Sequence, residues 1–302
     1  TSVDDYGLLA HQKLEDMLAG GGDREVLGAS EKKHPADFAL WKFTKPGEPA
    51  WPSPWGDGRP GWHSECVVMS LQLLGEGFDL HCGGADLRFP HHENERAQAV
   101  ALGKTFANHW MHNGFVVDTD GEKMSKSLGN VTNLLDLVEH YDPRAYRMLL
   151  LQTHYRSPVR VGQDNIDASV KAVGSIDGFF ARMSEVSTNA TADEATLQSF
   201  RAAMNNDLDT PGATALMFDT IRKANAALDV NDHVLAGALA GAVGEMCVAF
   251  GLQVNAFAEV SADIVEKAQQ LDAARAAKDF AAADALRNEL QAAGYVVETT
   301  KE

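Results

Sequence analysis

The order of apolar and polar positions predicts a mixed α/β part followed by a helical part. Residues 1–60 hold short apolar stretches that glycine and proline interrupt. The segment "KPGEPAWPSPWGDGRPGW" (45–62) contains five of the ten prolines of the chain. Proline fixes φ and removes a backbone donor, so this density excludes long helices and strands. The segment is therefore predicted to be an ordered, aromatic-rich loop.

The segments that follow alternate between helical and strand-like patterns. "ECVVMSLQLLG" (65–75) has helical periodicity and ends in glycine, whereas "FDLHCGGADL" (78–87) predicts a short strand with a glycine-rich turn. "FPHHENERAQAVALG" (89–103) predicts a helix preceded by proline and closed by glycine. "HNGFVVDTDGEKMSKS" (112–127) predicts a second strand and then a loop. This alternation suggests an α/β nucleotide-binding sheet.

The pattern becomes helical after about Asp136. "LLDLVEHYDPRAYRMLLLQTHY" (134–155) is helical on both sides of a proline, and the sequence downstream is alanine-rich with a 3.6-residue period. A Ser/Thr/Asn cluster at 184–195 is the best candidate for a linker. Residues 262–295 place apolar positions at i, i+3 and i+4, which predicts two amphipathic helices.

Charge and composition limit the classes of protein. With 302 residues, two or three domains are expected. The net charge of −17 opposes nucleic-acid binding by the chain as a whole, so a polynucleotide partner needs a local basic patch. Three cysteines give no disulfide framework. We find no signal peptide and no run of about 18 apolar residues. A soluble cytoplasmic protein without a membrane partner is predicted.

One basic stretch is the candidate for contact with a polyanion. "HYDPRAYRMLLLQTHYRSPVR" (140–160) contains Arg144, Arg147, Arg156 and Arg160 with tyrosines among them. A nucleic-acid backbone would rest there. Alternatively, these arginines cover apolar surface with their stems.

A metal site is the first chemical candidate. His91 and Glu95 lie four residues apart on a predicted helix, so an imidazole and a carboxylate share one face. Cys66, in "GWHSEC", would add a thiolate. A Cys/His/Glu set with one more ligand suits tetrahedral zinc. The alternatives are a surface His–Glu pair and a buried, inert cysteine.

Two further segments have a functional and a structural reading. His81 precedes a Gly-Gly turn closed by Asp86, which is either a ligand cradle or a tight turn. Trp62 and His63 follow the proline-rich loop and either line a small-molecule pocket or plug the space between elements.

"GEKMSKSLGN" (121–130) sets Lys123 and Lys126 among small hydroxyl residues. In an acidic chain this stretch is either a solvated turn or an arm that grips a polyphosphate.

Several motifs in order identify a family. "GRPGWHSEC", "FDLHCGGADLRFPHHENERAQA", "MHNGFVVDTDGEKMSKSLGN", "THYRSPV" and "MNNDLDTPGA" together resemble bacterial cysteinyl-tRNA synthetase, a class I aminoacyl-tRNA synthetase. The similarity runs over essentially all 302 residues. It implies the C-terminal half of a Rossmann-type catalytic domain followed by an α-helical tRNA-binding bundle. The expected parts are a partial catalytic domain (1–135), a stem-contact region (136–185) and an anticodon- or tRNA-binding domain (186–302).

The resemblance assigns roles to the candidate residues. Lys123 and Lys126 would face the phosphates of ATP, Lys126 foremost, with Ser125 and Ser127 as hydrogen-bond donors. Three zinc ligands are implied, namely Cys66, His91 and Glu95. Trp62, His63, His81, Asp86 and His92 match positions around the substrate.

The implied zinc, one per chain, binds the thiolate of L-cysteine and so discriminates against serine, whose hydroxyl is a poorer ligand. The implied reaction uses ATP with Mg²⁺ and charges tRNA(Cys), and the family expectation is a monomer.

The chain also departs from the family pattern. The His-Ile-Gly-His-type signature and the first zinc cysteine are not found, and there is no initiator methionine. We therefore expect a chain that lacks its N-terminal part, with the fourth zinc ligand and half of the ATP site in that part. This chain alone is expected to be incomplete as an enzyme. Cys82 stands where the family has glycine, which would add a thiol close to the zinc pocket.

Two alternatives remain open at this point. The related ligase that joins cysteine to an amino-sugar in mycothiol synthesis shares the zinc pocket and the lysine loop. A truncated, non-catalytic paralogue that binds tRNA or a partner protein would explain the absent ATP signature.

Overall fold

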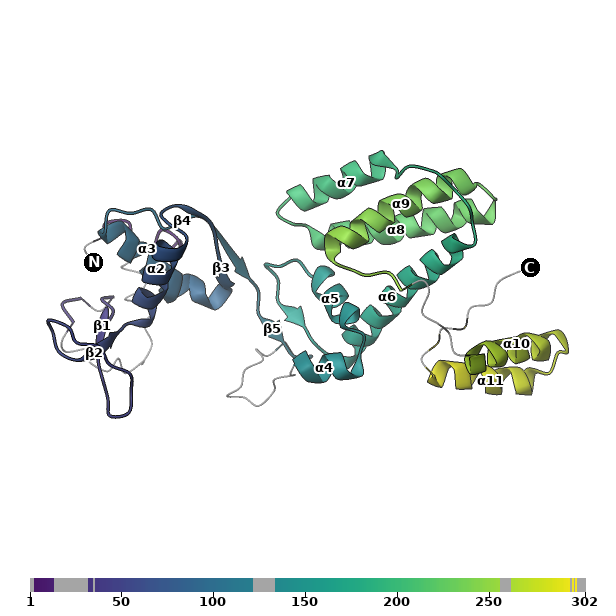
Figure 1. The fold of residues 1–302 in the computed structure, drawn as a ribbon, viewed down its shortest axis with the longest axis horizontal. Helices are drawn as coiled ribbons and strands as arrows, with labels where there is room; N and C mark the ends of the chain where they lie inside the picture. The colour runs from purple at the N-terminus through teal and green to yellow at the C-terminus, as the bar shows by residue number, and fades with distance from the viewer. Residues whose placement is uncertain are drawn as a thin grey trace. The chain divides into compact units, whose positions relative to one another are not determined.

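The computed structural model of the chain describes residues 3–13, 32–34, 36–121, 134–255 and 262–293, with residues 295 and 297. It comprises two compact units (Figure 1). The first unit is Thr1–Met124 with Tyr155–Val159, and the second is Ser125–His154 with Arg160–Glu302. The first contains the parallel strands and the second is mostly helical, which confirms the predicted α/β plus all-α architecture.

A small antiparallel hairpin opens the first unit. Strand β1 (Trp41–Phe43) pairs with β2 (Gly58–Pro60), and Trp51 forms a further antiparallel bridge to Gly58. A Cβ at Gly58 would lie 2.5 Å from the indole nitrogen of Trp41, so only glycine fits. The proline-rich segment is thus an ordered loop, as the sequence predicts.

The hairpin is followed by a β–α–β unit. Helix α2 (Trp62–Leu73) leads to β3 (Phe78–Gly84), and helical turns at Ala85–Leu87 and Arg88–His92 lead to α3 (Glu93–Ala101) and β4 (Ala107–Asn113). Strands β3 and β4 are parallel. Parallel strands need a crossover, which α3 supplies. A small core joins these elements: Val67, Phe78, Ala99, Phe106 and Trp110.

The two faces of the β3–β4 pair differ. His81 packs against Phe106 and Trp110 on the inner face. Because side chains alternate along a strand, Cys82 and its neighbour Leu80 point to the other face, where both are exposed. The expectation that Cys82 adds a thiol close to the metal pocket is therefore wrong, because strand alternation turns it away.

Short strands link residues far apart in the sequence. β5 (Val116–Val117) lies beside β6 (Val159–Arg160), and the amide of Val159 donates to the carbonyl of Phe115 at 2.8 Å. A Cβ at Gly114 would lie 2.3 Å from the carbonyl oxygen of Ser157, so the two backbones approach closely.

The second unit consists of helices. In chain order they are α4 (Leu134–His140), α5 (Pro143–Leu151), α6 (Gln163–Ser184), α7 (Glu194–Asn205), α8 (Thr210–Asp229), α9 (His233–Phe250), α10 (Ala262–Ala276) and α11 (Phe280–Ala292). Figure 1 shows α8 and α9 running side by side, and both contribute to one core. That core also includes one residue each of α5, α6 and α7, namely Met148, Phe179 and Phe200. They share it with Met217 of α8 and with Val243 and Met246 of α9.

Aspartates begin five of these helices. Each side chain accepts a hydrogen bond from a backbone amide two or three residues later, which satisfies an otherwise unpaired donor. They are Asp142, Asp193, Asp209, Asp232 and Asp279.

Helix α9 is long and apolar enough to cross a membrane by length and composition alone. However, 50% of it is buried in the structure, and its buried residues belong to the core of the bundle. The buried half of α9 supplies this core, which accounts for much of its apolar composition.

The predicted linker connects α6 to α7 and is ordered. Helix α6 ends at Ser184 and α7 begins at Glu194. Between them, the amide of Asp193 donates to the carbonyl of Ala238 in α9 at 2.9 Å. Gly237 leaves room for Thr188, whose Cγ2 lies only 2.5 Å from the place of a Cβ. The segment is therefore a packed part of the bundle.

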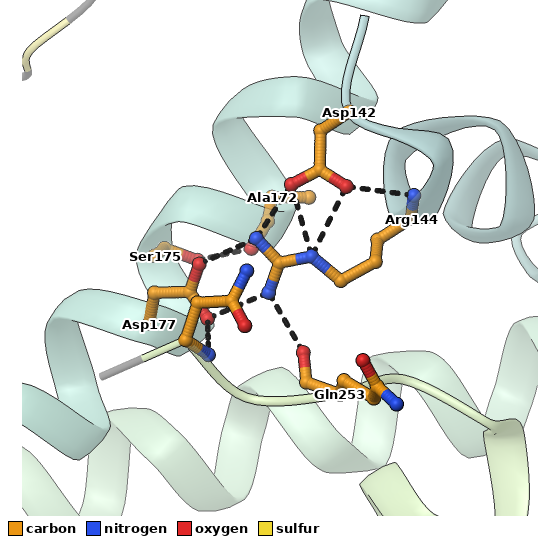
Figure 2. Close-up of polar contacts among 7 residues, drawn as sticks. Asp142, Arg144, Ala172, Ser175, Asp177 and Gln253 are labelled. Carbon is orange, nitrogen blue, oxygen red and sulfur yellow. Dashed lines mark hydrogen bonds and ion pairs between the residues drawn. The ribbon is translucent and has the colours of Figure 1, made fainter. Parts of the chain in front are cut away.

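Arg144 joins three segments of the second unit (Figure 2). Its guanidinium donates to both carboxylate oxygens of Asp177, at 2.9 and 2.8 Å, and to the carbonyl of Gln253 at 2.7 Å. It also donates to Asp142, and Asp177 accepts from the amide of Asn255 at 2.8 Å. The network ties α5 to α6 and to the segment after α9.

The electrostatics of this network follow from these contacts. The hydrogen bonds from Arg144 to Asp177, opposed by burial, raise the pKa of Arg144. Burial acts to raise the pKa of Asp142, but hydrogen bonds from Arg144 outweigh it and the net shift is downward. Because its donors are engaged by Asp142, Asp177 and Gln253, Arg144 is not available to a polyanion.

Candidate functional site

Three elements of the first unit bring the candidate residues together. Helix α2 begins at Trp62 and carries His63 and Cys66 in its first turns. Strand β3 supplies His81. The turn before α3 supplies His91 and His92, and the first turn of α3 supplies Glu95. The crossover connection places the turn and α3 against both other elements.

Cys66, His91 and Glu95 form a compact set of possible metal ligands. Their ligand atoms all lie within 4.8 Å of one another. His91 Nε2 is 3.4 Å from Glu95 Oε1. Glu95 is fully buried, and its Oε1 has no hydrogen-bond partner. A buried carboxylate oxygen without a donor is costly, so a cation bound at this point would remove that cost. Thiolate, imidazole and carboxylate are together typical ligands of zinc.

The other carboxylate oxygen of Glu95 is already engaged. His81 Nε2 donates to Glu95 Oε2 at 3.0 Å, and His92 Nε2 lies 4.0 Å from the same oxygen. His81 thus fixes the rotation of the carboxylate and leaves Oε1 directed toward Cys66 and His91. Such outer hydrogen bonds orient ligands in metal sites.

A second imidazole orients His91. His63 Nδ1 lies 2.7 Å from His91 Nδ1, so one of these nitrogens donates to the other. The indole of Trp62 stacks on His91 with ring centroids 4.0 Å apart and planes at 28°. These two contacts leave His91 Nε2 facing Glu95.

His112 belongs to this cluster, and reasoning from the sequence missed it. It is buried in β4, and its Nε2 lies 2.8 Å from His92 Nδ1. The available signal was strand alternation, because His112 falls on the same face of β4 as Trp110, which packs on His81.

Burial keeps the Cys66 thiol and the imidazoles of His63 and His92 neutral. It raises the pKa of the Cys66 thiol to about 11, and the charge of Glu95 acts in the same direction. It lowers the pKa of His63 to about 4 and that of His92 to about 3, with neighbouring imidazoles adding to both shifts. At neutral pH and without metal, the Cys66 thiol therefore keeps its proton, and the imidazoles of His63 and His92 are uncharged. Metal binding at such a set releases the thiol proton.

The glycines of the β3 turn make room for site side chains. A Cβ at Gly83 would lie 2.7 Å from His92 Cε1, and one at Gly84 would lie 2.5 Å from Asp86 Oδ1. The space is filled by the ring of His92 and by the carboxylate of Asp86. Asp86 itself is exposed in the turn after β3.

Glu93 and Asn94, next to Glu95 in α3, contact the N-terminal segment of the chain. Both are buried, and they accept hydrogen bonds from the amide of Ala10 at 3.0 Å and from the hydroxyl of Tyr6 at 2.5 Å. Burial, with the charge of Glu93, raises the pKa of Tyr6 to about 12. These contacts anchor α3 on the side away from the metal ligands.

The predicted phosphate-binding residues cannot be placed in this geometry. Lys123, Ser125, Lys126 and Ser127 lie outside the residues that the structure describes.

Two family models match the chain. Residues 1–171 match the model "tRNA synthetases class I (C) catalytic domain", and residues 199–255 match the model "DALR domain".

Curated relatives match nearly the whole chain. The chain is 42% identical over 308 residues to a cysteine–tRNA ligase of Pseudomonas fluorescens strain Pf-5, covering 98% of this chain and 65% of that protein. It is also 42% identical over 312 residues to the cysteine–tRNA ligase of Halorhodospira halophila, covering 100% of this chain and 66% of that protein. The chain thus spans about 65% of the length of these relatives.

Solved structures show similarity of fold. The chain aligns with the Agrobacterium radiobacter K84 agnB2 LeuRS–tRNA–LeuAMS ternary complex at a TM-score of 0.54 and 15% identity, over 67% of this chain and 32% of that one. It aligns with a putative arginyl-tRNA synthetase from Campylobacter jejuni at a TM-score of 0.51 and 15% identity, over 66% of this chain and 52% of that one.

Proposed function

The chain belongs to the class I tRNA synthetases, and from this premise we propose that it acts as a cysteine–tRNA ligase. The carboxylate of L-cysteine attacks the α-phosphate of ATP, which forms cysteinyl-adenylate and releases pyrophosphate. A hydroxyl of the terminal ribose of tRNA(Cys) then takes the cysteinyl group and AMP leaves. The observation that carries the proposal is the compact set of Cys66, His91 and Glu95, in which Cys66 is partly buried, His91 and Glu95 are buried, and Glu95 Oε1 has no hydrogen-bond partner.

These three residues fit zinc, which when bound takes the substrate thiolate directly as a ligand. The chain's own residues prepare the site for that role. His63 and Trp62 fix the plane of His91, and His81 holds Glu95 Oε2. Trp62, His63, His81, Asp86 and His92 surround the substrate, and His112 positions His92 from behind.

Lys123 and Lys126 supply the charge for the first step. We assign them to the phosphates of ATP with Mg²⁺, with Ser125 and Ser127 as donors, on the resemblance of "KMSKS" to the family's mobile loop. Ammonium groups that reach the α-phosphate as negative charge develops there stabilise the transition state. Covalent catalysis by a side chain is not required.

The helical parts serve tRNA in this proposal. Residues 136–185 contact the tRNA stem and residues 186–302 form the anticodon- or tRNA-binding part, in keeping with the match to the DALR domain. A cytoplasmic monomer is proposed. No observation favours the amino-sugar ligase or the non-catalytic paralogue, since the similarity to cysteine–tRNA ligases covers 98% or more of the chain.

Amino-acid selectivity tests the proposal. In the ATP–pyrophosphate exchange reaction of the complete protein, cysteine should support exchange. Serine should do so at least ~10³-fold less well in kcat/KM, because its hydroxyl is a poor zinc ligand. Removal of zinc with a chelator should abolish the cysteine-dependent exchange, and added zinc should restore it. Equal exchange with serine, or exchange that survives zinc removal, would show the proposed role of the cluster to be wrong.

A further inference from the structure

A short segment early in the chain contacts helix α3, and the proposed function does not use it. We call this segment, residues 5–10, the strap. The amide of Leu8 donates to the carbonyl of Asp5 at 3.1 Å, and the amide of Gln12 donates to the carbonyl of Gly7 at 3.1 Å. Gly7 is buried with a φ of 99°, a backbone conformation that favours glycine. The strap is therefore a folded turn with a defined shape.

The strap supplies the partners of two buried polar side chains of α3. The hydroxyl of Tyr6 donates to Asn94 Oδ1 at 2.5 Å, and the amide of Ala10 donates to Glu93 Oε2 at 3.0 Å. Asn94 is 2% exposed and Glu93 is fully buried. A buried acceptor that loses its donor costs free energy, so these two hydrogen bonds hold the strap against α3.

An ion pair adds a third contact between the strap and α3. The guanidinium of Arg96 donates to the carboxylate of Asp5, and this hydrogen bond lowers the pKa of Asp5. Burial raises the pKa of Tyr6, so its hydroxyl keeps the proton that it donates to Asn94. Both side-chain contacts of the strap are therefore present at neutral pH.

These contacts surround one of the candidate metal ligands. The three α3 residues that take part in them are the sequence neighbours of Glu95, so the backbone on both sides of Glu95 is tied to the strap. His92, at the N-cap of α3, forms no side-chain capping hydrogen bond that would fix the same turn. Side chains that bind a metal must be held to within about 0.5 Å of the productive geometry. The strap is in a position to provide that restraint for Glu95.

We propose that Tyr6 and Asp5 are positioning residues for the metal ligand Glu95. Through Asn94 and Arg96 they fix the first turn of α3, and so they set the affinity for zinc and the recognition of the cysteine thiol. This inference rests on the proposed function, in which zinc binds that thiol. Both residues act through α3, and neither is assigned a contact with zinc, cysteine or ATP.

Zinc affinity and exchange kinetics of Tyr6→Phe test the inference. The variant keeps the aromatic ring and removes only the hydroxyl that donates to Asn94. In the complete protein, competition with a zinc-binding dye should show about 10-fold weaker zinc binding, the lower end of the loss when an outer hydrogen bond of a metal site is removed. At saturating zinc, the KM for cysteine in ATP–pyrophosphate exchange should rise, whereas the KM for ATP should not change.

Asp5→Asn should act in the same direction with a smaller effect. The substitution removes the charge that pairs with Arg96, and the side chain of Asp5 is 47% exposed. Solvent screens an exposed pair, so its loss disturbs α3 less than loss of the buried hydrogen bond to Asn94.

A double-mutant cycle on Tyr6 and Asn94 separates positioning from stability. Asn94→Leu alone leaves the Tyr6 hydroxyl without its acceptor, so it should lower both the zinc affinity and the free energy of unfolding in chelator. In Y6F/N94L both partners are apolar, which should return much of the free energy of unfolding. The zinc affinity should stay about 10-fold below that of the wild type, because the bond that fixes the turn is still absent. A zinc affinity that recovers together with the stability would overturn the inference.

Two variants serve as controls for zinc affinity. Tyr141→Phe also removes a tyrosine hydroxyl that contacts a side chain, that of Gln163, but in the helical unit, and it should bind zinc like the wild type. Glu93→Gln keeps a carbonyl that accepts from Ala10, so the strap stays in place and zinc binding is retained. Wild-type zinc affinity in Tyr6→Phe, or an equal rise in the KM for cysteine and for ATP, would limit Tyr6 to a structural role and contradict the inference.

The outcomes distinguish this inference from the proposed function. If the wild type binds zinc and catalyses cysteine-dependent exchange, and Tyr6→Phe equals it in both, only the role of the strap is wrong. If the wild type shows no zinc-dependent exchange with cysteine, the proposed function is wrong, and the strap has no metal ligand to position.

Discussion

Glu95→Gln should lose its zinc and become no less stable when zinc is absent. In the metal-free protein the carboxylate is buried with Oε1 unpartnered, and a neutral amide removes that cost while its carbonyl still accepts from His81. When zinc is present, its binding stabilises the wild type against unfolding, whereas the variant binds too little zinc to be stabilised. Loss of a direct ligand should weaken zinc binding by at least ~100-fold, the upper end of what loss of an outer hydrogen bond costs.

The measurement is zinc content with thermal unfolding in chelator and in excess zinc. The wild type should carry about one zinc per chain and melt higher with zinc than without it. Glu95→Gln should carry far less zinc and show no such difference. Cysteine-dependent exchange should fall with the zinc content.

Glu93→Gln is the matched control, because Glu93 is an equally buried acid on the same helix. Its carboxylate faces the amide of Ala10 and the guanidinium of Arg96, and so it should keep its zinc. If Glu95→Gln were less stable than the wild type in chelator, the role of Glu95 would be structural and the metal assignment would fail.

Arg144→Met should destabilise the helical unit by about 2–3 kcal/mol. The change leaves Asp142 and Asp177 with charges that no longer have their cationic partner. A fully buried pair broken in this way costs ~3–5 kcal/mol, and the smaller value follows because the side chains of Arg144, Asp142 and Asp177 keep 15%, 34% and 20% exposure. Urea unfolding followed by circular dichroism measures the change.

Arg182→Met provides the comparison, since Arg182 pairs with Asp229 at 2.6 Å with side chains 44% and 66% exposed. Exposed pairs of this kind contribute about 0–1 kcal/mol. Equal effects of the two substitutions would mean that the network in Figure 2 adds nothing beyond an ordinary surface pair.

Periodicity was enough to place most elements and the metal candidates. The spacing of His91 and Glu95 and the position of Cys66 at a helix start predicted a common site, and all three ligand atoms do meet. The helices after about residue 136 were predicted in the same way. The Ser/Thr/Asn cluster at 184–195 predicted a break, and the structure has one between the end of α6 at Ser184 and the start of α7 at Glu194. These features depend on residues close together in the sequence, so the sequence pattern predicts them.

Features that depend on contacts between distant segments were missed. His112 is 20 residues from His92 and meets it only because β3 and β4 pair in parallel. Cys82 points away from the pocket because side chains alternate along β3, and the motif alone does not show this alternation. Arg144 was first considered for a polyanion, since nothing near it in sequence announces Asp177 or Gln253. The aromatic loop gave no sign of which rings would be exposed.

The three cysteines lie in three environments. Cys82 is exposed on the open face of β3, Cys66 is partly buried among the metal candidates, and Cys247 is buried in the bundle core 4.0 Å from the sulfur of Met217. A thiol-alkylating reagent should therefore react with the three cysteines at different rates. Cys82 should react first because it is exposed, and Cys66 should react only when no metal is bound at the pocket. Cys247 should react only when the helical bundle opens. The native cysteines can thus serve as chemical probes of the sheet face, the pocket and the bundle core, without any engineered label.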